Sequence, residues 1–108
     1  AQRYTDTLSD RLQMPVIRSN RSSAWAQYTV RVNNRDALQA KLKDNGIPTA
    51  VYYPIPLHLQ ECFQYLNYKK EDFPNSEKAS GKVISLPMNS FLSEKEIEHV
   101  SISLLNNV

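Results

Sequence analysis

The amino-acid sequence predicts an α+β fold, a two-layer sandwich in which helices pack on a small, mostly antiparallel sheet. Three observations support this prediction. Helical and extended segments alternate along the chain and are joined by short links. Residues 24–32 are rich in side chains that favour strands. Ser93 and Glu96 form a capping box ahead of an apolar helical stripe. Two layers let such elements bury one face each, and 108 residues suffice for one domain.

The first segment, residues 3–13, is predicted to be helical. Its apolar side chains recur every four residues, with polar residues between them. Pro15 ends this helix because a proline disfavours helical geometry in the residue before it. The pair Val16-Ile17 could then form a short strand ahead of a polar loop.

Residues 24–32 are the clearest strand in the sequence. Alternate residues share a face, and one face holds Ala26, Tyr28, Val30 and Val32. The pair Asn33-Asn34 offers a turn and a helix N-cap, so that a helix is predicted over residues 35–45. Gly46 stands where a helix favours a left-handed residue after its C-terminus.

A second strand is predicted over residues 49–53. Pro48 and Pro54 enclose it, because a proline belongs at the end of a ladder that it cannot extend. Residues 54–57 should be extended and rigid, since two prolines fix their φ angles. A short helical turn should follow near residues 59–66. The sequence therefore predicts a stiff aromatic loop at a strand end.

The last part of the chain is predicted to run helix, strand, helix. Pro74 suits the first turn of a helix that extends to about Lys82. Residues 83–86 form a third strand, which Pro87 stops. The final helix follows the capping box, and its apolar stripe comprises Ile97, Val100, Leu104 and Leu105.

Charge and composition argue against several classes of function. The formal net charge of +2 is too weak to indicate a nucleic-acid or anionic-membrane partner. No apolar stretch approaches the roughly 20 residues that cross a bilayer, and no signal peptide is recognisable. Cys62 is the only cysteine, which excludes an intrachain disulfide and fits a reducing compartment. Because the chain lacks an initiator methionine, we expect it to be an excerpt of a longer protein.

Tyr52 and Tyr53 are the first candidate site residues. They lie at a predicted strand end and should point to opposite faces, so that one anchors in the core and the other presents its hydroxyl. A phenol combines a stacking face with a hydrogen-bonding group, which suits a nucleotide or a sugar. Residue type alone favours a plainer interpretation, two packing tyrosines, because tyrosine is common in strands.

Metal, nucleophile and phosphate-loop chemistry find little support. His58 and Cys62 lie four residues apart, but together with His99 they are the only Cys and His residues, and no zinc-type spacing joins them. Nothing marks Cys62 as an activated nucleophile. The two glycines allow neither a P-loop nor a dinucleotide fingerprint. We predict no metal site.

Five sequence blocks carry a more specific signal. The main block runs from Gly46 to His58 and holds a Tyr-Tyr-Pro element, a second proline and a Leu-His pair. The other blocks are Ser23 to Arg31, Phe73 to Ala79, Val83 to Met88 and Leu92 to Ile97. Each block is weak alone, but in order and spacing all five resemble the DegT/DnrJ/EryC1/StrS aminotransferases. The resemblance covers nearly the whole chain.

This resemblance implies that residues 1–108 are the C-terminal small domain of a fold-type I, pyridoxal-phosphate-dependent nucleotide-sugar aminotransferase. Family members are cytoplasmic, usually homodimers, and move an amino group, commonly from glutamate, to a keto group on a nucleotide-linked sugar. A lysine of the large domain holds the cofactor. None of the seven lysines here matches that motif. We therefore expect no catalytic or cofactor-binding residue in this chain, and no activity from it alone.

The resemblance also assigns Tyr52, Tyr53 and His58 to substrate binding. Many members have histidine in place of Tyr52, and several have it in place of Ala26. The blocks are most similar to members that act on UDP-linked N-acetyl-3-keto sugars for lipopolysaccharide and O-antigen synthesis. Two other interpretations stay open. The chain could be a non-catalytic α+β module that binds a nucleotide or a protein through residues 52–58. It could also be a purely structural piece whose apolar surface drives self-association.

Overall fold

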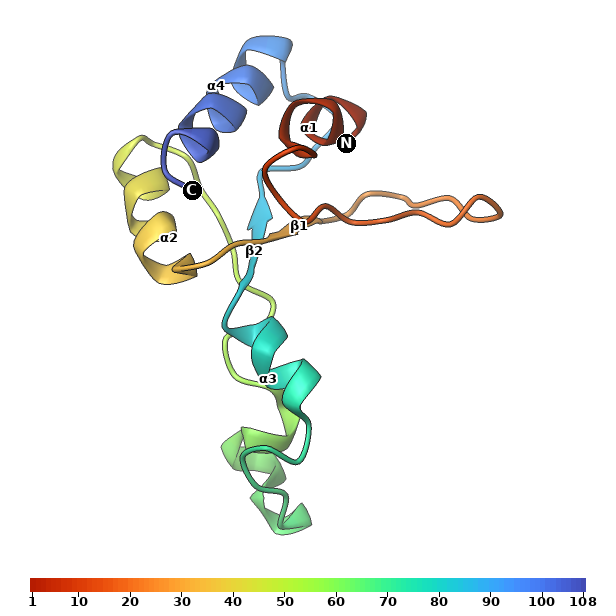
Figure 1. Cartoon of the computed structure of the whole chain (residues 1–108), viewed down its shortest axis with the longest axis vertical. Helices are drawn as coiled ribbons and strands as arrows, with labels where there is room; N and C mark the ends of the chain where they lie inside the picture. The colour runs from red at the N-terminus through yellow and green to blue at the C-terminus, as the bar shows by residue number, and fades with distance from the viewer.

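The structure of the chain is a computed structural model that describes residues 1–108 (Figure 1). Its elements in chain order are α1 (Gln2–Leu8), β1 (Tyr28–Arg31), α2 (Arg35–Asp44), the 3-10 helices η1 (Leu57–Leu59) and η2 (Glu61–Leu66), α3 (Pro74–Ser80), β2 (Val83–Leu86) and α4 (Glu94–Leu105). Helices thus pack against a small antiparallel sheet, and the predicted α+β class is confirmed.

The sheet consists of β1 and β2, which run antiparallel. Their register pairs Tyr28 with Leu86, Thr29 with Ser85, Val30 with Ile84 and Arg31 with Val83. Successive residues of a strand point to opposite faces. The larger apolar side chains therefore gather on one face, whereas the hydroxyl oxygens of Thr29 and Ser85 meet on the other face at 2.8 Å.

Both outer edges of the sheet carry a bridge of a single residue. Gln13 pairs with Arg31 along the free edge of β1, and Ala50 pairs with Ser85 along the free edge of β2. Ala50 and Ser85 exchange both backbone hydrogen bonds, at 3.2 Å from the Ala50 N–H and 2.8 Å from the Ser85 N–H. A chain segment therefore lies beside each edge strand at one point.

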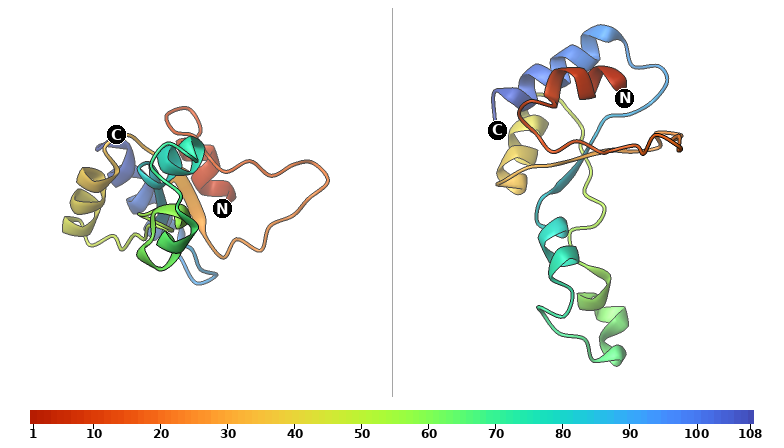
Figure 2. Two further views of the ribbon diagram at one scale, coloured as in Figure 1. Left: turned by 90° about the horizontal axis from the view of Figure 1, so that it is seen from below. Right: turned by 45° about the vertical axis from the view of Figure 1, so that its right-hand side comes forward.

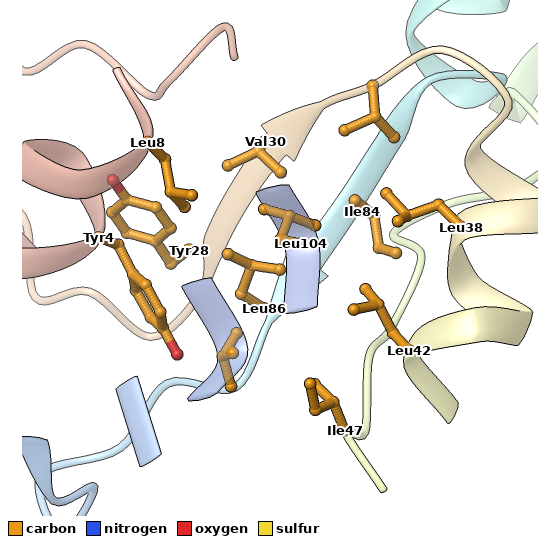
Figure 3. Packing of buried hydrophobic residues seen from close by; sticks show 12 residues of the cluster. Tyr4, Leu8, Tyr28, Val30, Leu38, Leu42, Ile47, Ile84, Leu86 and Leu104 are labelled. Atoms are coloured by element: carbon orange, nitrogen blue, oxygen red, sulfur yellow. The ribbon is translucent and has the colours of Figure 1, made fainter. Parts of the chain in front are cut away.

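The core lies between the sheet and helices α1, α2 and α4 (Figure 3). Its members are Tyr4, Leu8, Tyr28, Val30, Val32, Leu38, Leu42, Ile47, Ile84, Leu86, Val100 and Leu104.

Two tyrosines of this core pack against each other: the rings of Tyr4 and Tyr28 lie 5.2 Å apart. The Tyr4 hydroxyl donates to the Pro87 carbonyl at 3.1 Å, and the Tyr28 hydroxyl oxygen lies 2.5 Å from Thr5 Oγ1. Burial raises the pKa of Tyr4 to about 12. We call this assembly of α1, β1, α2, β2 and α4 the sandwich.

Two predicted helix ends are confirmed in detail. After α2, the Gly46 N–H bonds to the Lys43 carbonyl and the Ile47 N–H to the Leu42 carbonyl, which is the Schellman pattern. Gly46 has φ +74°, a conformation that side chains with a Cβ avoid. At the start of α4, Ser93 accepts from the Glu96 N–H while Glu96 accepts from the Ser93 N–H, which forms the capping box. Both ends are set by local sequence.

Several predicted elements have other bounds in the structure. The strand predicted over residues 24–32 spans only Tyr28–Arg31, because Trp25 has a left-handed φ of 51°, and Ala26 is exposed. The first helix ends at Leu8, because Ser9 and Asp10 favour turns over helix interiors. The pair Val16-Ile17 forms no strand; it belongs to a long loop over residues 14–27 that projects from the sandwich (Figure 1). The ladder ends at Gln13, because Pro15 cannot donate a hydrogen bond.

The predicted strand over residues 49–53 is also shorter than expected, since only Ala50 pairs with the sheet. Pro48 and Pro54 both lack a donor, and the chain leaves the edge of β2 after this single bridge. The N-cap of α2 is Asn34, as predicted, but its side chain makes no capping hydrogen bond.

Residues 54–80, which we call the lobe, project from the sandwich and hold η1, η2 and α3 (Figure 2). None of the residues in these helices is fully buried. The Cα radius of gyration is 15.4 Å, whereas a compact chain of this length has one of about 13 Å. The lobe and the loop over residues 14–27 together make the molecule extended.

Candidate functional site

Tyr52 and Tyr53 lie where the chain leaves the sheet for the lobe. Their side chains are 47% and 64% exposed, and their rings form an edge-to-face contact at 5.8 Å. The expectation that one of them anchors in the core is wrong: after Ala50 the chain has no strand partner that could place alternate side chains inward. The hydroxyls of Tyr4 and Tyr28 bond within the protein, whereas those of Tyr52 and Tyr53 face solvent. The pair is therefore available to a ligand.

A cleft of about 360 Å³ lies on the sheet side of Tyr52. Besides Tyr52, its polar lining comes from β2 and from the segments before β1, before Ala50 and after β2, namely Ser85, Gln27, Thr49 and Asn89. These groups supply both donors and acceptors beside the Tyr52 phenol. Such a lining suits a ligand with several hydroxyl or carbonyl groups.

A second cleft, of about 250 Å³, lies between the tyrosine loop and α3. Tyr52 lines this cleft as well, together with Tyr53, and α3 contributes Ser76 and Ser80. The remaining lining is Ile55, Pro56, Leu57, Ala79 and Val83. Tyr52 thus stands between two clefts, one with several polar groups and one that is mainly apolar, whereas Tyr53 lines only the second. An aromatic face and a polar group next to each other suit a ligand that has a ring and oxygen substituents.

The backbone of residues 51–55 forms no hydrogen bond with other backbone groups. Ala50, just before this stretch, is held to Ser85 of β2. Beyond it, the Leu59 N–H bonds to the Pro56 carbonyl as η1 begins. The tyrosines therefore lie on a short connecting segment that is fixed at its two ends. We call this segment, residues 51–57, the tyrosine bridge.

His58 lies at the lobe end of this bridge and lines neither tyrosine cleft. Its side chain is 7% exposed, and its Nε2 donates to Glu77 Oε1 at 3.0 Å; the Glu77 side chain is 16% exposed. The same Glu77 oxygen accepts from the Glu71 N–H at 2.8 Å. Burial alone would raise the pKa of Glu77, but the hydrogen bonds from Glu71 and His58 outweigh it and hold that pKa below its ordinary value.

Aromatic side chains of the lobe cover His58. The Phe73 ring lies 4.8 Å from the imidazole, and the Tyr68 ring packs edge-on against Phe73 at 5.1 Å. His58 also lines a largely apolar cleft of about 340 Å³ with Leu57, Phe63, Leu66, Tyr68, Phe73 and Ser76. The structure thus brings Tyr52 and Tyr53 together and places His58 in a different cleft. Direct contact between His58 and a substrate stays a prediction.

The largest hollow, of about 420 Å³, shares no residue with the tyrosine clefts. Arg11, Arg31 and Lys82 line it, together with exposed asparagines, and it contains no buried polar group. No group of three or more His, Cys, Asp or Glu side chains is arranged to hold a metal ion. No helix combines the length and apolar character that crossing a membrane requires.

Sequence reasoning missed Glu77, Gln27 and Asn89. Glu77 was noticed only as part of a helical block, although its partner His58 is 19 residues away and nothing in either residue type marks the pairing. Gln27 carried a usable signal, because strand alternation puts it on the face opposite to Tyr28. Asn89 follows β2 directly beyond Pro87-Met88, a position that only the fold brings to the cleft.

Comparison with known proteins gives this geometry its context. Residues 1–105 match the sequence pattern of the DegT/DnrJ/EryC1/StrS aminotransferase family. The chain belongs to this family. The match spans the sandwich, the tyrosine clefts and the lobe, so the candidate site lies within family sequence throughout.

Relatives and solved structures agree with this membership. The chain is 44% identical over 92 residues to UDP-2-acetamido-2-deoxy-3-oxo-D-glucuronate aminotransferase of Pseudomonas aeruginosa, covering 85% of this chain and 25% of that protein. It is 35% identical to dTDP-3-amino-3,6-dideoxy-alpha-D-galactopyranose transaminase of Aneurinibacillus thermoaerophilus, covering 82% and 24%. S. venezuelae DesV in complex with a ketimine intermediate superposes with a TM-score of 0.92 at 26% identity, covering 97% and 29%. The family member described here spans about a quarter of the length of these relatives.

Proposed function

We propose that this chain is the C-terminal small domain of an aminotransferase that moves an amino group from glutamate to a keto nucleotide-sugar. In this proposal Tyr52 and Tyr53 form the edge of the site that faces the nucleotide-sugar. One observation carries it: in a chain of this aminotransferase family, an exposed tyrosine pair lines a mainly apolar cleft, and its first member also lines a neighbouring cleft that holds several polar groups.

The chain's own residues do not fit a pyridoxal phosphate site. A Schiff base needs a lysine beside the reacting groups, but all seven lysines are exposed on the surface. None of them lines either tyrosine cleft. In our proposal pyridoxal phosphate is therefore held by a part of the protein outside these 108 residues, and the chain alone has no transaminase activity.

The substrate class follows from the cleft chemistry and from the relatives. A phenol can stack on a sugar or base ring and exchange hydrogen bonds with its oxygens, and Gln27, Thr49 and Asn89 add further partners. The similar proteins named above act on UDP- and dTDP-linked sugars. We propose a UDP-linked keto sugar of lipopolysaccharide or O-antigen synthesis, because the UDP-sugar relative has the higher identity. We further propose a cytoplasmic homodimer.

Replacing the tyrosines in the full-length protein tests this function. Tyr53→Phe and Tyr52→Phe should each raise KM for the keto nucleotide-sugar about three- to tenfold, the effect expected when one hydrogen bond is lost. The rate of the glutamate half-reaction, followed by the absorbance change of the cofactor, should not change. Tyr65→Phe is the matched control, because Tyr65 is 73% exposed on the lobe and lines neither tyrosine cleft.

Absence of amino transfer to every keto nucleotide-sugar tried would overturn the proposal. The alternative is a module that binds the nucleotide by itself. Titration of the 108-residue chain with UDP-sugars, monitored by NMR, distinguishes this module from a domain that needs the rest of the enzyme. Shifts confined to residues 52–58 at micromolar ligand would favour that module. A chain that gives no shifts alone, but belongs to an active full-length enzyme, supports a domain that needs its partner.

A further inference from the structure

The tyrosine bridge is clamped at both ends to one continuous segment of the chain. Ala50 is bonded to Ser85 of β2, and His58 is bonded to Glu77 of α3. Between these points residues 51–55 form no hydrogen bond with other backbone groups, although the Ile55 carbonyl accepts a local one from Gln60 Nε2 at 3.2 Å. Because α3 runs into β2 through Gly81 and Lys82, both anchors belong to residues 77–85. Two contacts therefore tie the tyrosine segment to residues distant in the sequence, one in the sheet and one in the lobe.

The lobe contact joins the buried His58 side chain to a Glu77 side chain that is only 16% exposed. Glu77 Oε1 accepts from both the His58 ring and the Glu71 N–H, which ties η1 and the loop before α3 to one carboxylate. Phe73 covers the imidazole at 4.8 Å and limits the access of water. A hydrogen bond to a charged acceptor is stronger in such a setting than at an open surface.

The same helix that carries Glu77 also forms a wall of the apolar tyrosine cleft. Ser76 and Ser80 of α3 line that cleft together with Tyr53. A change in the contact between Glu77 and His58 therefore moves the loop relative to α3 and alters the cleft between them. The sheet anchor at Ala50 cannot compensate, because it holds only the other end of the bridge.

We propose that Glu77 is a positioning residue that acts through His58 to hold Tyr52 and Tyr53 in place for the nucleotide-sugar. This inference rests on the proposed function, and it gives His58 a supporting part in place of direct contact with substrate. Glu77 touches neither tyrosine cleft, so its effect reaches the ligand through the position of the bridge relative to the α3 wall. The glutamate half-reaction does not depend on the tyrosines and should be insensitive to Glu77.

Three variants of the full-length enzyme test this role. Glu77→Leu removes the acceptor at similar size and should raise KM for the keto nucleotide-sugar about tenfold, with kcat and the glutamate half-reaction unchanged. Glu77→Gln keeps an oxygen acceptor at the same place and should stay within about threefold of wild type. Glu94→Gln is the matched control: Glu94 forms an exposed ion pair with Arg3 in the sandwich, and its replacement should change no kinetic constant.

We call the contact between Glu77 and His58 the clamp. A double-mutant cycle distinguishes positioning through this clamp from direct binding of the substrate by His58. In the clamp, His58→Phe and Glu77→Leu break the same contact, so the double variant should raise KM no more than either single one. Additive effects on KM would overturn the proposal, because they assign His58 a separate contact with the substrate. An unchanged KM in Glu77→Leu, or an equal loss in both half-reactions, would also overturn it.

A readout independent of catalysis keeps the clamp testable if the proposed function fails. Fluorotyrosine can be incorporated and the Tyr52 and Tyr53 signals assigned by Tyr→Phe substitution. In the ¹⁹F NMR spectrum these two signals should shift or broaden in Glu77→Leu but not in Glu77→Gln, while those of the buried Tyr4 and Tyr28 stay in place. An enzyme inactive on nucleotide-sugars that still shows this pattern would refute the substrate and retain the clamp. Unchanged Tyr52 and Tyr53 signals in Glu77→Leu would refute the clamp.

Discussion

The sandwich and the lobe are held together by different forces. The sandwich buries a continuous cluster of apolar side chains, several of them with no exposed area. The helices of the lobe contain no fully buried residue, and the lobe exposes large apolar side chains, namely Ile55, Leu57, Tyr65, Leu66, Tyr68 and Phe73. Its order depends on the contact between His58 and Glu77 and on the aromatic rings around it. Stability is therefore concentrated in the sandwich, and the lobe should open at lower free energy.

This difference shows how the candidate site is divided. Tyr52 and Tyr53 lie at the junction. The cleft on the sheet side of Tyr52 contains no lobe residue, whereas the weakly held lobe supplies most of the lining of the cleft between the tyrosine loop and α3. Elements that adjust around a ligand commonly come from the less stable part of a protein. The comparison predicts that substitutions in the sandwich change global stability, whereas those in the lobe act locally.

The largest effect is expected from Leu104, which has no exposed area in the centre of the core. Leu104→Ala should lower the free energy of unfolding by about 2–5 kcal/mol, because it removes buried methyl groups and leaves a cavity. Ile102→Ala on the same helix is the control: Ile102 is 49% exposed, and its truncation should cost much less. Urea denaturation followed by circular dichroism measures both. Equal losses would mean that the sandwich is not the main source of stability.

Alkaline pH should weaken the sandwich through Tyr4. Burial raises the pKa of Tyr4 from 10.0 to about 12, so the folded state keeps the proton that the unfolded state releases first. The stability that this provides is complete below pH 10 and is lost as the pH rises towards 12. The loss should reach about 2–3 kcal/mol, and denaturation curves across this range measure it.

Tyr4→Phe provides the comparison for that measurement. This variant should lose less of its free energy of unfolding at alkaline pH than wild type does. Some dependence of stability on pH should remain, because burial raises the pKa of Tyr28 too. Parallel pH profiles for the two proteins would argue against a buried, neutral Tyr4.

The smallest effect is expected in the lobe at acidic pH. The pKa of Glu77 is held below its ordinary value of 4.5, so its contribution is present above that value and is lost as the pH falls through the lowered one. Amide hydrogen exchange, corrected for intrinsic rates, should show the Glu71 N–H losing protection while Val30 in the core keeps it. In the Glu77→Gln variant, the loss of protection at the Glu71 N–H should no longer depend on acidic pH. Simultaneous loss of protection at both amides would contradict a separately opening lobe.

The sequence could predict those parts of the fold that depend on local patterns. Strand alternation identified the buried side chains at Tyr28, Val30 and Val32, and the capping box at Ser93 predicted the start of α4. The left-handed Gly46 was predicted from its place after an apolar helix. In each case the residues that determine the structure lie within a few positions of one another.

The lobe and the exact site geometry could not be predicted in the same way. The contact between His58 and Glu77 joins residues 19 positions apart, and its burial depends on Phe73. The sequence placed Tyr52 and Tyr53 on opposite faces because it assumed a full strand, whereas the structure has a single bridge at Ala50. Whether a short extended segment becomes a strand depends on the length of the partner edge, which local propensity does not encode.

The single-residue bridges at Gln13 and Ala50 also bear on how the chain behaves at high concentration. A bare edge strand is a template on which a second molecule can add its own strand and start an aggregate. Here each edge is already occupied at one point, and a proline stands two residues away from each bridge, Pro15 on one side and Pro48 on the other. An incoming strand would meet an interrupted row of donors on both sides. A sheet of only two strands is thereby protected against growth into a fibre.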